Sequence, residues 1–234
     1  MVTDLSFLKS EKHKKILEEI SQSLREDNEI IGMMLNGSHA RGDANIDSDL
    51  DLLILLKEDH NRTFEAKFIY KILVEYKYLD INKARARLQS NHMEPYQYLE
   101  GKILFDDLGS LNTLKDEALI IYNSYQLDKN EKKAIYHWLF ASRIKIEAAI
   151  KSQDYLKAIF VTSTSSYKIM EGIWGVCNKP IPPAGSVLSH LDDLKNDIPF
   201  ITDWTETLFL GTIEERIHKA IEMIEWINQR IMND

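Results

Sequence analysis

Apolar residues are spaced in two different ways along this chain. Up to residue 126, short apolar runs alternate with polar turns and occasional helical spacing, which is typical of a small sheet with helices. From residue 127 onward, apolar residues recur every three or four positions, which predicts helices only. The pattern therefore predicts an α/β chain with a small mixed β-sheet domain over residues 1–126 and an all-α helical bundle domain over residues 127–234.

In the first domain we expect an amphipathic helix over residues 7–24, followed by buried strands over residues 30–35 and from residue 48 onward. The spacing predicts another helix over residues 64–73. Strand character returns over residues 74–81.

The second domain contains three long amphipathic stripes, over residues 135–150, 156–174 and 217–231. Residues 178–185 contain three prolines and cannot lie inside a helix. Three long helices make a bundle. Most of its aromatic side chains are expected to be core, and the acidic residues between 192 and 206 are expected to lie in a loop-rich segment.

Two acids open the second apolar run, in the sequence Ser48-Asp49-Leu50-Asp51. Because side chains alternate faces along a strand, Asp49 and Asp51 point the same way and lie about 6.5 to 7 Å apart. Paired carboxylates suit Mg²⁺, which takes hard oxygen ligands and keeps positions open for water and phosphate. An ordinary solvated strand end would also explain these acids.

A turn, Asn36-Gly37-Ser38, ends the first of the two apolar runs. Gly37 lets the backbone approach an anion closely, and Ser38 can cap the following helix and offer a hydroxyl to a phosphate. Arg41 could neutralise a phosphate, although a solvated loop arginine is the more common role of such a residue. Together with Ser48, these residues form the candidate nucleotide-binding set, and His39 receives no role.

A Gly-Ser turn after a strand, followed by an Asp-x-Asp that opens the next strand, resembles the signature of the DNA polymerase β-like nucleotidyltransferase superfamily. The resemblance implies one or two Mg²⁺ ions on the paired acids and transfer of a nucleoside monophosphate from an NTP, with ATP expected. It also implies a third carboxylate at a strand end, as base or metal ligand. Asp80 ends the strand predicted over residues 74–81, so we place it in the catalytic and metal set with Asp49 and Asp51.

A helical bundle after the catalytic domain is similar to the arrangement in aminoglycoside and lincosamide nucleotidyltransferases. That resemblance implies a small-molecule hydroxyl as acceptor and a role in antibiotic resistance. A protein AMP-transferase remains an alternative within enzymes. A non-catalytic regulatory module, such as one half of a toxin–antitoxin pair, is the alternative from another class.

The net charge of -8 and the pI near 5.4 argue against a nucleic-acid partner, which would require clustered Lys and Arg. The same charge favours small cationic acceptors, or serves solubility alone. No apolar run is long enough to span a membrane and no secretory signal opens the chain, so we expect a cytoplasmic protein without a membrane partner. The single cysteine, Cys177, is expected to be a structural thiol near a helix end. The oligomeric state stays open.

Overall fold

The computed structural model describes residues 4–57 and 61–233. The chain folds as two compact units, one ending at Asn123 and the next beginning at Ser124, three residues before the boundary expected from the sequence. The first unit contains a mixed five-stranded sheet with helices, and the second contains helices alone. The predicted fold class is therefore confirmed.

The sheet of the first unit has the strand order β3-β4-β2-β1-β5. Its strands are β1 (Ile30–Asn36), β2 (Leu50–Leu56), β3 (Phe64–Ile69), β4 (Ile72–Asp80) and β5 (Lys102–Asp106). Neighbouring strands pair antiparallel except β2 and β4, which run parallel. The starts of β2 and β4 therefore meet at the same edge of the sheet.

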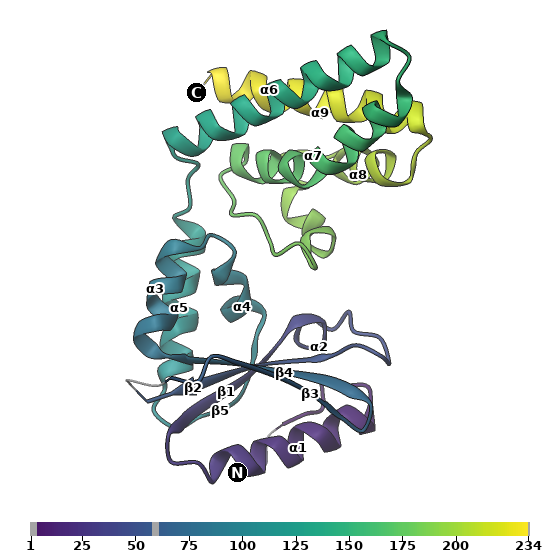
Figure 1. Cartoon of the computed structure of the whole chain (residues 1–234). Coiled ribbons are helices and arrows are strands. Elements are labelled where there is room, and N and C mark those ends of the chain that lie inside the picture. Colours follow the sequence, from purple (N-terminus) through teal and green to yellow (C-terminus); the bar gives the residue numbers. More distant parts are fainter. Residues whose placement is uncertain (1–3, 58–60, 234) are drawn as a thin grey trace. The chain divides into compact units, whose positions relative to one another are not determined.

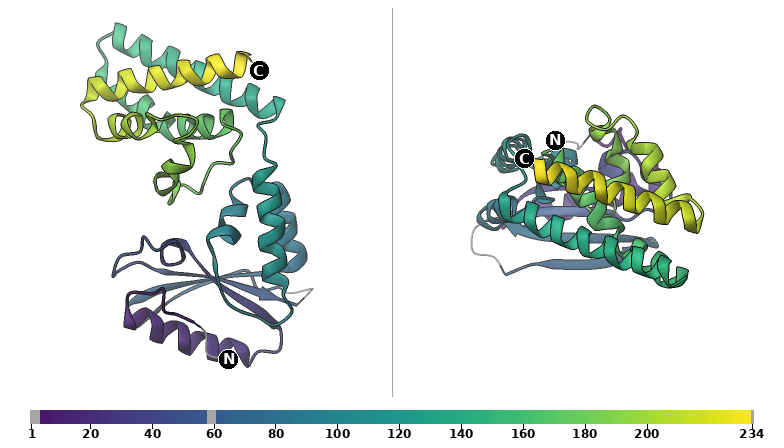
Figure 2. Two further views of the ribbon diagram at one scale, coloured as in Figure 1. Left: turned by 180° about the vertical axis from the view of Figure 1, so that it is seen from behind. Right: turned by 90° about the horizontal axis from the view of Figure 1, so that it is seen from above.

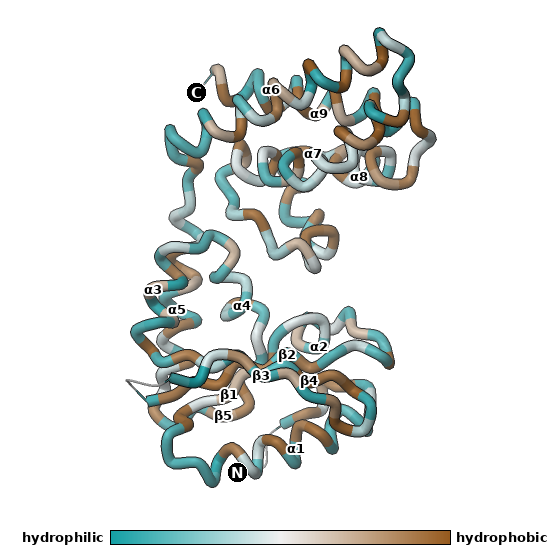
Figure 3. The backbone as a smooth tube through the Cα atoms, in the orientation of Figure 1, coloured by the Kyte–Doolittle hydropathy of each residue, from teal (hydrophilic) through white to brown (hydrophobic). Residues whose placement is uncertain are grey.

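Helices cover both faces of this sheet (Figures 1 and 2). They are α1 (Glu11–Arg25), α2 (Gly37–Arg41), α3 (Ile81–Ser90), α4 (Glu94–Glu100) and α5 (Ser110–Asn123). Helix α1 lies on one face, and α3, α4 and α5 lie on the other. In Figure 3, α1 alternates between hydrophobic and hydrophilic segments, as expected of a helix that buries one side.

Alternation along β2 divides the core into two layers. Leu52 and Ile54 pack in the layer that contains α1, whereas Leu53 and Leu55 pack in the layer that contains α3 and α5. Asp51 shares a face with Leu53 and Leu55 because the side chains are two residues apart. The acid at the start of β2 therefore belongs to the face of α3, α4 and α5.

The helix predicted over residues 64–73 is wrong, because this segment forms β3, a turn and the start of β4. Tyr70 and Lys71 both have positive φ, 48° and 65°, as a two-residue type I′ hairpin turn requires. The sequence lacks the Asn-Gly or Asp-Gly pair that usually marks this turn. Pairing with β4 decides the conformation, since β3 is an edge strand whose residues are largely exposed.

The helical unit consists of α6 (Lys129–Lys151), α7 (Tyr155–Val176), the 3₁₀ helix η1 (Val187–Leu194), α8 (Ile201–Leu210) and α9 (Ile213–Asn233). The three long helices predicted from the stripes are α6, α7 and α9. The segment expected to be loop-rich instead contains η1 and most of α8. Among the described helices, none is long and apolar enough to cross a membrane.

Helix α7 buries a different face in its first half than the stripe predicted. Leu156 and Phe160 are 81% and 66% exposed, whereas the smaller Ala158 and Thr162 are fully buried. Small side chains let helices approach closely, so close packing places them at the helix contacts. Trp174, in the second half, is fully buried as expected, but Trp138 of α6 is 54% exposed.

Cys177 forms the C-cap of α7, in agreement with the predicted position near a helix end. Burial, and secondly the charge of Asp197, raises the pKa of its thiol to about 11. The thiol therefore stays protonated at neutral pH, which fits a structural role.

Candidate active site

The turn after β1 touches the acid at the start of β2. Asn36 pairs with Asp51 across the two strands, and Gly37 follows with φ of 65°. A Cβ atom at Gly37 would lie 1.9 Å from Oδ2 of Asp51. Only glycine combines this backbone conformation with this close approach. The structure thus brings together the turn and the acid that the sequence placed in one site.

Gly37→Ala is expected to lower the transfer rate by about a hundredfold or more, because the new methyl group must displace the Asp51 carboxylate. Gly42→Ala is the matched control. Gly42 also has positive φ, 93°, but a Cβ there would meet nothing within 4 Å. Both variants carry the backbone strain, so steady-state rates and melting temperatures should separate strain from displacement. Equal rates for the two variants would contradict this expectation.

A third acid stands beside Asp51 on the neighbouring strand. The parallel pairing of β2 and β4 sets Asp51 opposite Glu75, with both side chains on the same face. Burial, and then the charges of Asp49 and Glu75, raises the pKa of Asp51 to about 6, while Arg41 opposes the rise. The charges of Asp49 and Glu75 therefore both act on Asp51.

None of these three acids has an ion-pair partner in the part of the chain that the structure describes. Among the described residues, no salt bridge joins Asp49, Asp51 or Glu75 to a Lys, Arg or His. By contrast, the buried carboxylate of Glu94 pairs with Nζ of Lys77 at 3.0 Å and also with Arg87. An uncompensated acidic group of this kind is what a divalent cation would stabilise.

Asp80 does not converge with Asp49 and Asp51, and this expectation is wrong. Asp80 pairs with Leu56, at the opposite end of β2 from Asp51, which is about 16 Å along a strand. Its carboxylate caps α3, accepting from the Lys83 amide at 2.8 Å and approaching Nζ of Lys83 at 3.1 Å. Burial alone would raise the pKa of Asp80, but the hydrogen bonds and charge of Lys83 outweigh it and lower the pKa.

Sequence reasoning missed Glu75, although part of the signal was present. Period two along β4 separates Glu75 from Tyr76 and Tyr78, which pack in the layer of α1. Which acid of β4 meets Asp51 depends on the register between β2 and β4. No local pattern encodes that register.

Ser38 lies next to Gly37 but does not cap α2. The N-cap of this helix is Asn36, and no side chain caps it. Ser48 is held by the loop before β2: its hydroxyl accepts from the Asn45 amide at 3.0 Å, and its carbonyl is 3.1 Å from Nε2 of His13. The hydroxyl of Ser48 therefore shapes the loop.

Arg41 forms ion pairs with Asp43 and with Glu100 of α4, each at 3.3 Å. Its side chain is mostly buried, and its charge lowers the pKa of Asp51. The structure thus holds a guanidinium whose charge acts on Asp51, in place of a solvated loop arginine.

The protein would supply only part of the ligands of a divalent cation at this site. Within residues 4–57 and 61–233, no group of three or more His, Cys, Asp or Glu side chains is arranged to hold a metal ion. Mg²⁺ usually binds one or two protein carboxylates and completes its shell with water and substrate phosphates. The uncompensated charge around Asp51 fits such a partial donor set, with Asp49 as the second ligand.

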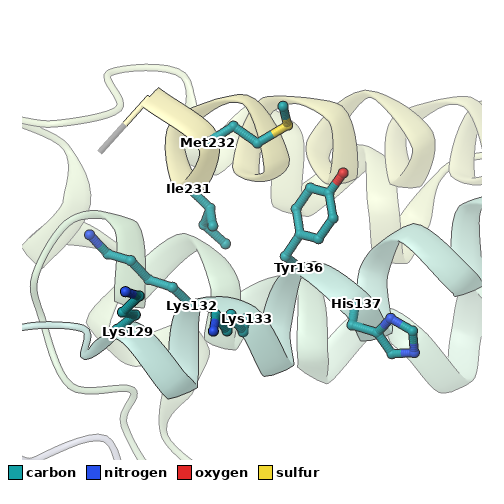
Figure 4. Close-up of a pocket in the computed structure, with 7 residues that line it drawn as sticks. All are labelled: Lys129, Lys132, Lys133, Tyr136, His137, Ile231 and Met232. Atoms are coloured by element: carbon teal, nitrogen blue, oxygen red, sulfur yellow. The ribbon is translucent and has the colours of Figure 1, made fainter.

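A separate cavity of about 750 Å³ lies within the helical unit (Figure 4). Its lining combines basic and apolar side chains from the start of α6 and the end of α9: Lys129, Lys132, Lys133, Tyr136, His137, Ile231 and Met232. No carboxylate is among these lining residues. The cavity is therefore no alternative site for a divalent cation.

Comparison with known proteins adds a family to this geometry. A family model described as nucleotidyltransferase domain matches residues 17–165, which is more than half of the chain. Among solved structures, the chain is similar to a nucleotidyltransferase-like protein from Exiguobacterium sibiricum 255-15. The two share 15% identity over 93% of this chain and 74% of that one, with a TM-score of 0.49. A search of curated proteins gave no match.

Proposed function

We propose that this chain, which belongs to the nucleotidyltransferase domain family, transfers AMP from ATP to a hydroxyl of a small molecule. Aminoglycosides and lincosamides are the acceptors we favour. The proposal rests on one observation: Asp49, Asp51 and Glu75 lie near the Gly37 turn and have no ion-pair partner among the described residues. Proteins of this family generally use an NTP and a divalent metal.

The residues around the turn would bind the triphosphate. Gly37 leaves the backbone open to an anion, Ser38 offers a hydroxyl, and Arg41 supplies a fixed positive charge. Asp49 and Asp51 would hold Mg²⁺. The ion, when bound, neutralises phosphate charge and makes the α-phosphorus more electrophilic.

Glu75 is positioned to act on the acceptor. It lies on the far side of Asp51 from the phosphate-binding turn and has no ion-pair partner among the described residues. Its carboxylate would take the proton of the acceptor hydroxyl. The acceptor oxygen then forms a bond to the α-phosphorus, the bond from that phosphorus to the bridging oxygen breaks, and pyrophosphate leaves with the electron pair.

The edge strand β3 supplies a surface for the acceptor next to Glu75. In the β3–β4 pairing, Ala66 lies opposite Glu75 and Phe68 lies opposite Leu73, so these side chains share the face of Asp51. Phe68 is 74% exposed, and Phe64 on the same face is 56% exposed. Edge strands usually carry charges on their exposed faces, so two exposed aromatics beside the acids support a binding role.

The chemistry of this surface favours a cationic acceptor. Carboxylates attract an ammonium group, and an aromatic face attracts it through its quadrupole. An acceptor that combines amino groups, hydroxyls and an apolar ring face would match both. Aminoglycosides and lincosamides are compounds of this kind.

The proposal is tested with the purified protein, Mg²⁺ and each of the four α-labelled NTPs. Acceptors are kanamycin, neomycin, lincomycin, clindamycin and a set of candidate proteins. We expect label from ATP on a small molecule and stoichiometric release of pyrophosphate. Label on protein alone would favour the protein AMP-transferase, and absence of any label or pyrophosphate would overturn the proposal.

Phe68→Ala is expected to raise the acceptor KM about tenfold, because an aromatic contact beside the reacting hydroxyl is lost, and to leave the ATP KM within twofold. Tyr70→Ala is the matched control. Tyr70 belongs to the same hairpin and is 54% exposed, but its hydroxyl bonds Glu19 and its ring lies under Lys15, both on α1. An acceptor KM that changes equally in both variants would exclude this role for Phe68.

A further inference from the structure

Two histidines meet in the interior of the first unit. His13 of α1 is fully buried, and His39 of α2 is 8% exposed. Their ring centroids are 4.3 Å apart, with the rings tilted by 44°. Neither histidine was assigned a role from the sequence, and the chemistry described above uses neither.

Both histidines interact with the backbone of Ser48. Nε2 of His13 lies 3.1 Å from the Ser48 carbonyl oxygen. A carbonyl only accepts, so His13 carries its proton on Nε2 and donates it. Burial, and secondly His13, lowers the pKa of His39, and the Ser48 backbone opposes this lowering.

If the two histidines served only to fill the core, they would lower the stability of the fold. Nδ1 of His13 and Nε2 of His39 are buried without a hydrogen-bond partner among the described residues. An unpartnered buried polar atom destabilises a fold, and apolar side chains of similar size would pack here without that cost. The hydrogen bond from His13 to Ser48 is the feature that an apolar residue could not replace.

The place of Ser48 gives these hydrogen bonds a consequence for the site. Ser48 directly precedes Asp49, and His39 directly follows Ser38. The two rings thus connect the phosphate-binding turn, the loop that carries the first acid, and α1. A cavity of about 270 Å³ lies against this loop, lined by His39, Gly42 and Ile46 among others.

We propose that His13 and His39 are positioning residues, His13 because it holds the Ser48 carbonyl and His39 because its ring packs against His13, and that the pair thereby keeps Asp49 in register with the Gly37–Ser38 turn. The consequence for nucleotide binding rests on the proposed function. The restraint on the loop does not, because it follows from the contacts of His13 and His39 alone.

The test uses His13→Phe, which keeps a ring in the core but removes the donor, and His13→Gln, which restores a side-chain N–H. Ile20→Ala is the matched control, since Ile20 is also buried on α1 but has no contact of this kind with the loop. Hydrogen exchange of the amides over residues 45–51 is measured without ligand. The affinity for α,β-methylene-ATP with Mg²⁺ is measured by calorimetry.

We expect His13→Phe to speed exchange of these amides at least tenfold and to weaken nucleotide binding about 10- to 100-fold, as loss of a residue that orients a ligand does. His13→Gln should recover most of both, and Ile20→Ala should lower the melting temperature while changing neither. His39→Ala, which removes the ring packed against His13, is measured in the same way and decides the question if His13→Phe does not fold.

Wild-type exchange and wild-type affinity in the folded His13→Phe or His39→Ala variant would overturn the proposal, as would equal effects of Ile20→Ala. If the wild-type protein does not bind the nucleotide at all, the proposed function fails. Hydrogen exchange then still decides whether the histidines hold the loop.

Discussion

Asp51→Asn is expected to lower the transfer rate at least about a thousandfold while making the ligand-free protein more stable at neutral pH. The rate falls because Asp51 would bind the cation that neutralises the phosphate charge, and such a cation stabilises the transition state by several kcal/mol. The stability rises because burial and the charges of Asp49 and Glu75 disfavour the ionised carboxylate of Asp51 in the folded protein. A substitution at an ordinary structural acid would not separate the two properties in this way.

The sign of the stability change depends on pH. The pKa of Asp51 is raised from 3.8 to about 6 in the folded protein, so the folded state binds its proton more tightly than the unfolded state does. Below pH 3.8 the carboxyl is protonated in both states and carries no penalty. As pH rises through about 6, the folded protein loses this stability, by about 1 to 2 kcal/mol after solvent screening. Above that pH, the Asn variant should therefore be more stable by this amount.

Urea unfolding of both proteins at pH 4 and pH 7.5, without Mg²⁺, measures this difference. Asp47→Asn is the control, because Asp47 is an exposed acid of the same loop. It should change neither rate nor stability appreciably. An Asp51→Asn protein that is less stable than wild type at pH 7.5, or that retains most of its turnover, would contradict the arrangement of acids described here.

Glu75→Gln is expected to slow transfer by about 10² to 10⁴, the usual contribution of a general base, while affinity for the Mg²⁺–nucleotide complex stays largely intact. Asp80→Asn should do the reverse. It should leave turnover within about twofold and lower stability by about 0.3 to 1 kcal/mol, because the amide oxygen still caps α3 but the negative charge beside Lys83 and the helix N-terminus is lost.

Turnover numbers, nucleotide affinity by calorimetry and melting temperatures of the two variants provide the comparison. Both substitutions replace a carboxylate by its amide on the same strand, so each serves as the control for the other. The assignment of Glu75 would be abandoned if the larger rate loss belonged to Asp80→Asn. Equal loss of nucleotide affinity and rate in Glu75→Gln would move Glu75 into the metal shell.

Several features of this protein follow from the sequence because they are local. Gly37 and Asp51 are brought together by a β-strand, a turn and a second strand that are adjacent in the chain, and the apolar runs mark both strands. The change of spacing near residue 126 likewise indicated the division into two units, since helical and strand periodicity are each visible within a few turns or residues.

Other features depend on which surfaces meet. The apolar spacing of Leu156 and Phe160 predicts that their face of α7 is buried. The helix instead buries the face that carries Ala158 and Thr162, because small side chains permit close packing. Similarly, no turn signature follows the residues of β3, and they form a strand because they pair with β4.

The third acid is the clearest case of a feature that only the tertiary structure decided. The sequence by itself determined the paired acids Asp49 and Asp51, the turn beside them, and the strand that contains both Glu75 and Asp80. Period two shows that Glu75 and Asp80 point to opposite faces of β4, but it does not show which face meets Asp51. The parallel register of β2 and β4 sets Glu75 beside Asp51 and places Asp80 at the far end. That register arises from packing between segments distant in the chain, which no local periodicity records.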